Sequence, residues 1–136
     1  MPHAGHILFL EDCKRLRDLL VVGVGSDLML KANKGGNRPI LNQEIRLKTL
    51  DSFKPVDYCF IDSLSKPEAP LFILSFIFEK LKPDIYVVNE DVFDIKYREK
   101  ISSKFNVQLV GLKRSCPEEF ENISTSKIIQ KIQNLS

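Results

Sequence analysis

Both histidines of the chain lie in one short motif at its start, His3-Ala4-Gly5-His6, which leads directly into apolar residues at helical spacing. The free N–H groups and the dipole of a helix N-terminus attract phosphate, and two imidazoles there add further donors. Gly5 has no Cβ, so a ligand can approach the backbone closely at that position. The alternative is a tag remnant or a frayed terminus, and the four residues alone leave both interpretations open.

A basic segment from Lys31 to Pro39 is the second feature that could bind phosphate, because it carries Lys31, Lys34 and Arg38 around a Gly-Gly pair. One interpretation is a mobile loop whose cations neutralise a polyphosphate. The other is a solvated connector, which segments of this composition usually form. For Lys34 and Arg38 the sequence favours neither interpretation.

Three polar residues, Asn89, Glu90 and Asp91, follow an apolar run at 85–88. Open α/β sheets bind ligands just beyond the carboxyl ends of their parallel strands, so these residues are candidates for binding a substrate. Glu90 and Asp91 have a simpler alternative, since acidic residues are also favoured in the first turn of a helix.

The elements that would position these residues alternate between amphipathic helices and short apolar strands. Such alternation with short loops predicts a doubly wound α/β fold, in which a parallel sheet carries helices on both faces. The run 19–24 is apolar on both faces and is expected to be a buried strand. Expected helices lie at 6–16, about 27–30, after Asn42, and at 71–81, 95–104 and 128–135; expected strands lie at 19–24, 56–61, 85–88 and 107–112.

At 136 residues and 15.6 kDa the chain is expected to form one domain, residues 1–136. Its hydrophobic core is expected to be large enough to need no stabilising disulfides or metal ions. Its net charge of +2 does not indicate a nucleic-acid or membrane partner, and no apolar run reaches the length of a membrane span. The three cysteines, Cys13, Cys59 and Cys116, are odd in number and widely spaced. We therefore expect reduced thiols in a cytoplasmic protein and no His/Cys metal site.

A further strand is expected ahead of the histidine motif, because a phosphate-binding turn of this kind connects a strand to a helix. Only Met1 and Pro2 precede His3. The first strand of a doubly wound sheet is central, so without it two half-sheets with exposed edges would remain. We therefore expect an N-terminally truncated fold whose natural form has roughly ten more residues. The alternative is that the cell makes this short form.

With these elements placed, the sequence resembles the cytidylyltransferase-like nucleotidyltransferase family over nearly its whole length. His3-Ala4-Gly5-His6 matches the family's HxGH signature, and 21–27 is similar to the strand and turn after its first helix. Residues 31–38 resemble the basic loop, and Arg46 stands where the family carries an arginine near the triphosphate. Ile123-Ser124-Thr125-Ser126-Lys127 resembles the second signature, which opens the last helix. Two signatures in the right order favour a phosphate site over a tag remnant.

The resemblance implies a Rossmann-like (HUP-type) fold and a reaction in which a substrate phosphate oxygen attacks the α-phosphate of a nucleoside triphosphate. Pyrophosphate leaves, and no covalent enzyme intermediate is expected. Mg²⁺ is implied as an ion bound through the triphosphate, with few protein ligands. A homodimer is expected by family analogy, and the broad apolar stripe of 71–81 agrees with it.

The resemblance also assigns roles to individual residues. His6 is expected to stabilise the transition state, with His3 and Lys31 as the other catalytic residues, and Arg46 to hold the β- or γ-phosphate. Ser124 and Thr125 would bind the triphosphate at the last helix. The expected nucleotide-binding residues are His3, Gly5, His6, Lys34, Arg46, Asn89, Ser124 and Thr125.

The favoured reaction is transfer of CMP from CTP to a phosphorylated small molecule. Two alternatives stay open: transfer of AMP from ATP by the same machinery, and a non-catalytic or inactive nucleotide-binding homologue. The segment 88–91 departs from the Gly-Gly-Asp or Gly-Asp-Asp turn of many relatives. The identity of the acceptor is therefore not implied by the resemblance.

Overall fold

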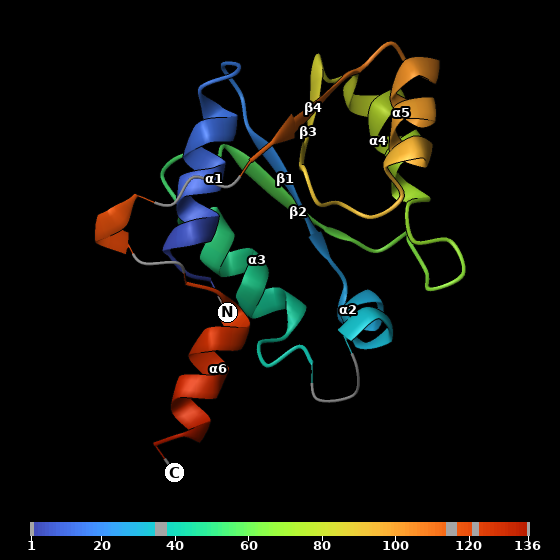
Figure 1. Ribbon diagram of the computed structural model, residues 1–136. Coiled ribbons are helices and arrows are strands. Elements are labelled where there is room, and N and C mark those ends of the chain that lie inside the picture. The colour runs from blue at the N-terminus through green and yellow to red at the C-terminus, as the bar shows by residue number, and fades with distance from the viewer. Residues whose placement is uncertain (1, 35–37, 114–116, 121–122, 136) are drawn as a thin grey trace.

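The computed structural model describes residues 2–34, 38–113, 117–120 and 123–135, with the side chain of Lys34 left out. The helices are α1 (Ala4–Lys14), α2 (Asp27–Lys34), α3 (Gln43–Asp51), α4 (Ile73–Leu81), α5 (Ile95–Lys104) and α6 (Thr125–Gln133), with a 3-10 turn η1 (Glu118–Phe120). The strands are β1 (Val21–Gly25), β2 (Tyr58–Asp62), β3 (Ile85–Asn89) and β4 (Gln108–Leu112) (Figure 1). The predicted alternation of helices and strands is confirmed.

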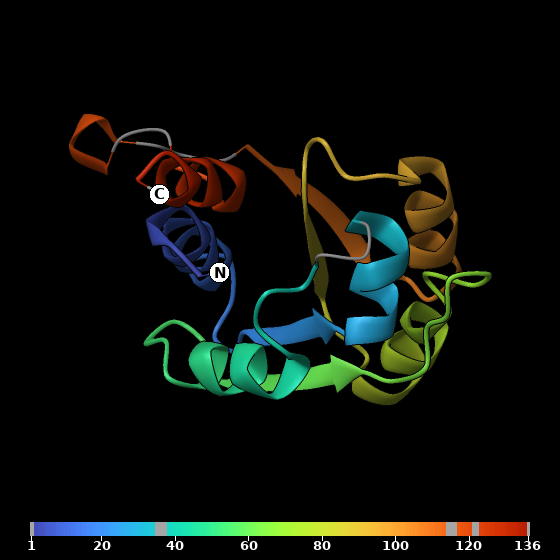
Figure 2. The same cartoon turned by 90° about the horizontal axis from the view of Figure 1, so that it is seen from below.

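The described strands form two separate parallel pairs. β1 pairs with β2 in the register Val22↔Cys59, and β3 pairs with β4 in the register Val88↔Gly111. In Figure 2 the β1–β2 pair and the β3–β4 pair run in clearly different directions. The parallel α/β class is confirmed, and so is the expectation of two half-sheets in place of one continuous sheet.

The helices cover the two half-sheets separately. α3 packs against β1 and β2, whereas α5 packs against β4 and α4 lies beside α5. The main buried apolar cluster lies in this second half and consists of Leu74, Phe78, Ile101 and Val107. Both views place α1 next to α6, so the first and last helices of the fold are neighbours (Figures 1 and 2).

The strand β1 is more exposed than its apolar sequence predicts. Val24 is 5% exposed, but Val21 is 41% and Leu19 66% exposed. A ladder runs along one edge of β1 only, so no described strand covers the other edge. The prediction of a buried strand over 19–24 is therefore wrong for its first half.

The helix α2 is longer than predicted. Ser26 Oγ accepts a hydrogen bond from the N–H of Met29 at 3.4 Å, so Ser26 caps the helix. Asp27 in the first turn complements the helix dipole. The helix continues to Lys34, so the prediction of a loop beginning at Lys31 is wrong.

The apolar stripe of α4 is only partly covered. Leu74 and Phe78 are buried, whereas Phe72 and Phe76 are 59% and 46% exposed. The exposed part is compatible with the homodimer expected from the sequence, which stays a prediction. Among the described residues, no helix combines the length and the apolarity that a membrane crossing requires.

Candidate functional site

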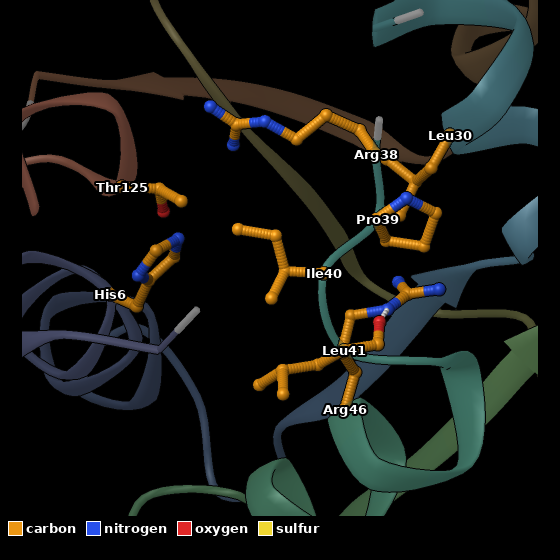
Figure 3. A pocket seen from close by; sticks show the side chains of 8 residues that line it. All are labelled: His6, Leu30, Arg38, Pro39, Ile40, Leu41, Arg46 and Thr125. Carbon is orange, nitrogen blue, oxygen red and sulfur yellow. Dashed lines mark hydrogen bonds between the residues drawn. The ribbon is translucent and has the colours of Figure 1, made fainter. Parts of the chain in front are cut away.

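The N-terminal ends of α1 and α6 meet at a pocket of about 170 Å³. The pocket is lined by His6, Leu30, Arg38, Pro39, Ile40, Leu41, Arg46 and Thr125 (Figure 3). Typical pockets for whole ligands measure roughly 300–1,000 Å³. A phosphate group therefore fits this pocket, and a nucleoside triphosphate bound there would extend beyond it.

The two histidines lie together at the start of α1. His3 is the N-cap residue, with φ −152° and ψ 171°, and its carbonyl oxygen accepts a hydrogen bond from the His6 N–H at 2.9 Å. The imidazole rings lie 3.9 Å apart between centroids at an angle of 49°. The side chain of His6 is exposed and lines the pocket, where Figure 3 shows it beside Thr125. The motif thus forms the helix N-terminus predicted from the sequence.

Gly5 makes room for its neighbours. A Cβ at this position would lie 3.2 Å from two atoms of the His3 ring and 3.8 Å from the carbonyl oxygen of Ile123. The first distance is shorter than nine in ten real Cβ contacts. The absence of a side chain therefore lets the His3 ring fold against α1, and the close approach of a ligand to Gly5 stays a prediction.

Arg46 is bound to other parts of the protein. Its Nη2 donates to Asp27 at 2.7 Å, Nη1 to the Gly25 carbonyl at 2.8 Å, and Nε to the Leu41 carbonyl at 3.1 Å. The side chain is 15% exposed. Asn42 caps α3 as predicted, accepting a hydrogen bond from the Ile45 N–H at 2.9 Å. Arg46 therefore ties β1, α2 and the 38–41 segment to α3, and its contact with phosphate stays a prediction.

Burial and the contacts with Arg46 act in opposite directions on the pKa of the Asp27 carboxylate, and the net effect lowers it. Partial burial raises its pKa, but the hydrogen bond and the charge of Arg46 outweigh that effect and hold the pKa below its ordinary value. The backbone N–H of Asp27 also donates to the side chain of Gln43 at 3.0 Å. The start of α2 is thus held by two side chains of α3.

Arg38 is a pocket residue whose role the sequence left undecided. Figure 3 shows its guanidinium extending across the pocket toward Thr125. The pair His6 and Thr125 lies on one side of the pocket and Arg46 on the other, with the side chain of Ile40 projecting between them. The interpretation of Arg38 as a purely solvated residue is therefore not supported.

The lysines of the basic segment do not line the pocket among the described residues. Lys31 is exposed on α2, whose preceding residue Leu30 does line it. The side chain of Lys34 and the Gly-Gly pair at 35–36 lie outside the described residues. The roles assigned to Lys31 and Lys34 are neither supported nor contradicted by this arrangement.

The second signature lies where the sequence predicted it, at the start of α6. The Oγ of Ser124 accepts a hydrogen bond from the Lys127 N–H at 3.3 Å, so Ser124 caps the helix. Thr125 is the first helical residue and lines the pocket. Of the two residues, Thr125 is therefore the one with direct access to a ligand in the pocket.

Asn89 is the last residue of β3, and it does not line the pocket. Its carbonyl accepts a hydrogen bond from the Val92 N–H at 3.1 Å, and the Glu90 N–H donates to the Leu112 carbonyl at 3.2 Å. The helix α5 begins only at Ile95, so the alternative that Glu90 and Asp91 start that helix is wrong. These residues form a turn at the carboxyl end of the strand, which keeps them candidates for substrate binding.

Sequence reasoning missed the apolar lining of the pocket, which consists of Leu30, Pro39, Ile40 and Leu41. A signal was present, because an apolar Pro-Ile-Leu run follows the basic segment directly. Apolar side chains in a loop must pack against another part of the protein, and here they line one side of the phosphate-sized pocket. Cys116, by contrast, lies outside the described residues.

The sequence matches a known protein family and several curated proteins. A family model described as cytidylyltransferase-like matches residues 1–131. The bifunctional protein HldE of Campylobacter jejuni subsp. doylei is 40% identical over 133 residues, which are 97% of this chain and 25% of that protein. The HldE of Helicobacter acinonychis is 36% identical over 132 residues, covering 96% and 25% of the two chains. The chain thus spans about a quarter of the length of the curated relatives it matches.

A solved structure shares the fold. It is the crystal structure of the lipopolysaccharide core biosynthesis protein from Thermoplasma volcanium GSS1, with a TM-score of 0.67 and 30% sequence identity. The similarity covers 85% of this chain and 90% of that one. Since the family model matches nearly the whole chain and the fold is shared, the chain belongs to the cytidylyltransferase-like family of nucleotidyltransferases.

Proposed function

We propose that the protein transfers a nucleoside monophosphate from a nucleoside triphosphate to a phosphorylated sugar and releases pyrophosphate. The observation that carries this proposal is the meeting of two helix N-termini at one phosphate-sized pocket, with His6 from α1 and Thr125 from α6. Helix N-termini bind phosphate through their free N–H groups and dipoles. A sugar phosphate as acceptor is supported by the HldE relatives and by the lipopolysaccharide core biosynthesis protein.

The reaction requires positioning and charge stabilisation. An oxygen of the acceptor phosphate attacks the α-phosphorus, and the bond from that phosphorus to the bridging oxygen of the β-phosphate breaks as pyrophosphate leaves. The protein needs to hold the two reactants in line and to neutralise the charge that develops on the phosphates. His6 donates to the α-phosphate in this proposal, and Arg38, whose guanidinium extends across the pocket toward Thr125, contributes a positive charge.

The other predicted residues extend the site around the triphosphate. In this proposal the His3 ring supports the His6 ring by contact, and the absence of a side chain at Gly5 leaves room for that contact. Lys31 and Lys34 on α2 approach the β- and γ-phosphates, and Arg46 either binds them or holds the pocket wall. Residues Ser124, Thr125 and Asn89 complete the proposed nucleotide site.

Mg²⁺ enters the proposal as an ion carried by the triphosphate. Within the described ranges there is no group of three or more His, Cys, Asp or Glu side chains that could hold a metal ion. Asp27, which lies beside the pocket residue Arg46, is already paired with it. This donor set fits an ion whose ligands are mainly phosphate oxygens and water. When bound, such an ion neutralises phosphate charge.

The nucleotide is proposed to be ATP. The sequence analysis favoured CTP, and the cytidylyltransferase-like family model agrees with either nucleotide. The sequence pattern is similar to that of the family's heptose-phosphate adenylyltransferases, which use ATP, as well as to that of its glycerol-3-phosphate and ethanolamine-phosphate cytidylyltransferases. CTP is the second candidate, because the segment 88–91 and the residues that follow β4 lack a base-specific signature.

We further propose a cytoplasmic homodimer. The Cys13 and Cys59 thiols are free, which agrees with a reducing compartment. The side chains of Phe72 and Phe76, four residues apart at the start of α4, are exposed and form an apolar patch that a second copy could cover. Light scattering at micromolar concentration tests the dimer, and a monomer would refute it.

A pyrophosphate-release assay tests the proposed reaction. The protein is incubated with Mg²⁺, with ATP or CTP, and with hexose or heptose phosphates as acceptors. Release with ATP and a sugar phosphate is the expected result, and release with CTP alone would change the nucleotide. If no combination releases pyrophosphate, while nucleotide binding is measurable by equilibrium dialysis, the protein is the non-catalytic binding module and the proposal is wrong.

A further inference from the structure

Arg98 on α5 is a buried cation that the proposed reaction does not use. Arg98 is 6% exposed, and it has no carboxylate partner among the described residues. Burying an unpaired charge is costly unless hydrogen bonds or other contacts compensate for it. The environment of Arg98 must therefore supply that compensation.

The compensation comes from two aromatic residues and one backbone carbonyl. Nε donates to the Phe93 carbonyl at 3.0 Å, and Nη1 donates to the hydroxyl of Tyr86. The guanidinium carbon lies 4.8 Å from the centroid of the Phe93 ring and 5.9 Å from that of Tyr86. Both distances are within the range of a cation–π interaction. Arg98 thus joins β3, α5 and the segment between them.

The segment between β3 and α5 is fixed at both ends. At its start, the Val92 N–H donates to the Asn89 carbonyl, and the Glu90 N–H donates to β4. At its end, the Arg98 side chain holds the Phe93 carbonyl and the Arg98 backbone N–H holds the Asp94 carbonyl at 3.1 Å. Arg98 therefore holds the far end of the turn that begins with Asn89.

The backbone at this far end needs support. Asp94 has φ 54° and ψ 39°, in the left-handed region that residues with a side chain rarely adopt. Such a conformation persists only where the surroundings hold it. Arg98 donates hydrogen bonds to the carbonyl oxygens of Phe93 and Asp94, which flank the Cα of Asp94, and these two bonds supply that support.

We propose that Arg98 is a positioning residue for nucleotide binding: through Phe93 and Tyr86 it holds the segment Asn89–Asp94 in the shape that binds the nucleoside triphosphate. The inference rests on the proposed function, in which Asn89 belongs to the nucleotide site. Arg98 itself does not touch the substrate. Loss of its fork-shaped hydrogen bonding should therefore weaken nucleotide binding and leave the chemical step unchanged.

The test compares Arg98→Met with Lys100→Met, which removes a cation from the exposed face of the same helix. Arg98→Met is expected to raise KM for the triphosphate about tenfold, the effect of losing one or two hydrogen bonds from a charged donor. The kcat and the KM for the sugar phosphate should stay within about twofold. Arg98→Lys keeps the charge and one hydrogen bond, so it should recover part of the loss. Lys100→Met should behave as the unaltered protein.

Hydrogen exchange gives a readout that does not depend on turnover. In Arg98→Met the amides of 91–94 should exchange faster than in the unaltered protein, while those of β2 and α3 stay the same. Unchanged exchange at 91–94 would overturn the inference, and so would faster exchange combined with an unchanged KM for the triphosphate. A parallel fall of kcat and of the folded fraction would also overturn it, because Arg98 would then be merely structural.

A failure of the proposed function would give different results from a failure of the positioning role of Arg98. If the unaltered protein binds ATP in equilibrium dialysis but releases no pyrophosphate, the proposed reaction is wrong. The positioning role is then decided by the dissociation constants, and an unchanged Kd in Arg98→Met would overturn it. If the unaltered protein binds neither ATP nor CTP, both proposals are wrong.

Discussion

The Nη2 atom of Arg46 lies 2.7 Å from a carboxylate oxygen of Asp27, so an arginine expected to hold phosphate is bound to the first turn of α2. All three of its donor nitrogens have partners within the protein. A ligand phosphate that reaches Arg46 must share it with, or take it from, these acceptors. The pair therefore links the shape of the pocket to the charge state of Asp27.

Asp27→Asn should lower the urea midpoint at pH 7 more than Asp51→Asn does, because the Lys48–Asp51 pair is exposed. Although burial raises the pKa of Asp27, Arg46 lowers it below 3.8. A carboxyl with a lowered folded-state pKa stabilises the protein above its unfolded pKa, and this stability is lost as the pH falls through the folded value. The difference between the variants should therefore shrink below about pH 3.8. A constant difference from pH 7 to pH 3 would contradict this.

Gly5→Ala should reduce kcat/KM by at least about tenfold, since misplacement of a catalytic group by an ångström can cost up to 10². The new Cβ would lie 3.2 Å from the His3 ring, which must move and shift the His6 ring it contacts. Helix stability should not fall, because alanine is the better helix former. The matched control is Gly111→Ala, whose Cβ meets only Glu90 Cγ at 3.9 Å. Equal activity of the two variants would rule out this role of Gly5.

His6→Ala should reduce kcat by about 10²–10³, the usual loss on removing one donor to a developing charge. The side chain is exposed in the pocket, so circular dichroism and the urea midpoint should remain unchanged. Gln130→Ala on the exposed face of α6 is the control. Full turnover in His6→Ala would remove His6 from the mechanism.

Phe78→Ala should destabilise the protein by about 3–5 kcal/mol, as deletion of a buried aromatic ring usually does. Phe78 is 3% exposed and packs edge-to-face against Tyr86 and Phe105, with ring centroids 5.3 Å and 6.2 Å away. Phe76→Ala, on the exposed part of α4, should cost less than about 1 kcal/mol in the monomer. Urea unfolding measures both. A similar loss in the two variants would mean that a second copy buries Phe76.

Cys13 should resist alkylation by iodoacetamide at pH 8 in the folded protein. Burial, and secondly the charge of Asp12, raise the pKa of its thiol to about 11, so little reactive thiolate is present. Cys59 also has a raised pKa, caused first by burial. Mass spectrometry after alkylation with and without urea measures the effect. Rapid native modification of Cys13 would show that α1 is not packed as described.

Much of the fold follows from local patterns along the chain. Asn42 was expected to open a helix and caps α3 in the structure, because a cap depends on a side chain and an N–H three residues away. The strands of the predicted parallel class also appear, within two residues at each end. The end of α2 was missed, since a basic, Gly-containing segment has the composition of a loop whether or not its first residues are helical.

The candidate site was likewise predicted only in part from the sequence. The sequence by itself determined the family, the two signatures and their places at the starts of α1 and α6, because each depends on residues close together in the chain. The tertiary structure alone decided that Arg46 binds Asp27 and that Arg38 reaches the pocket. These facts arise from contacts between distant segments, where competing partners and burial settle which interaction forms, and no local spacing records that competition.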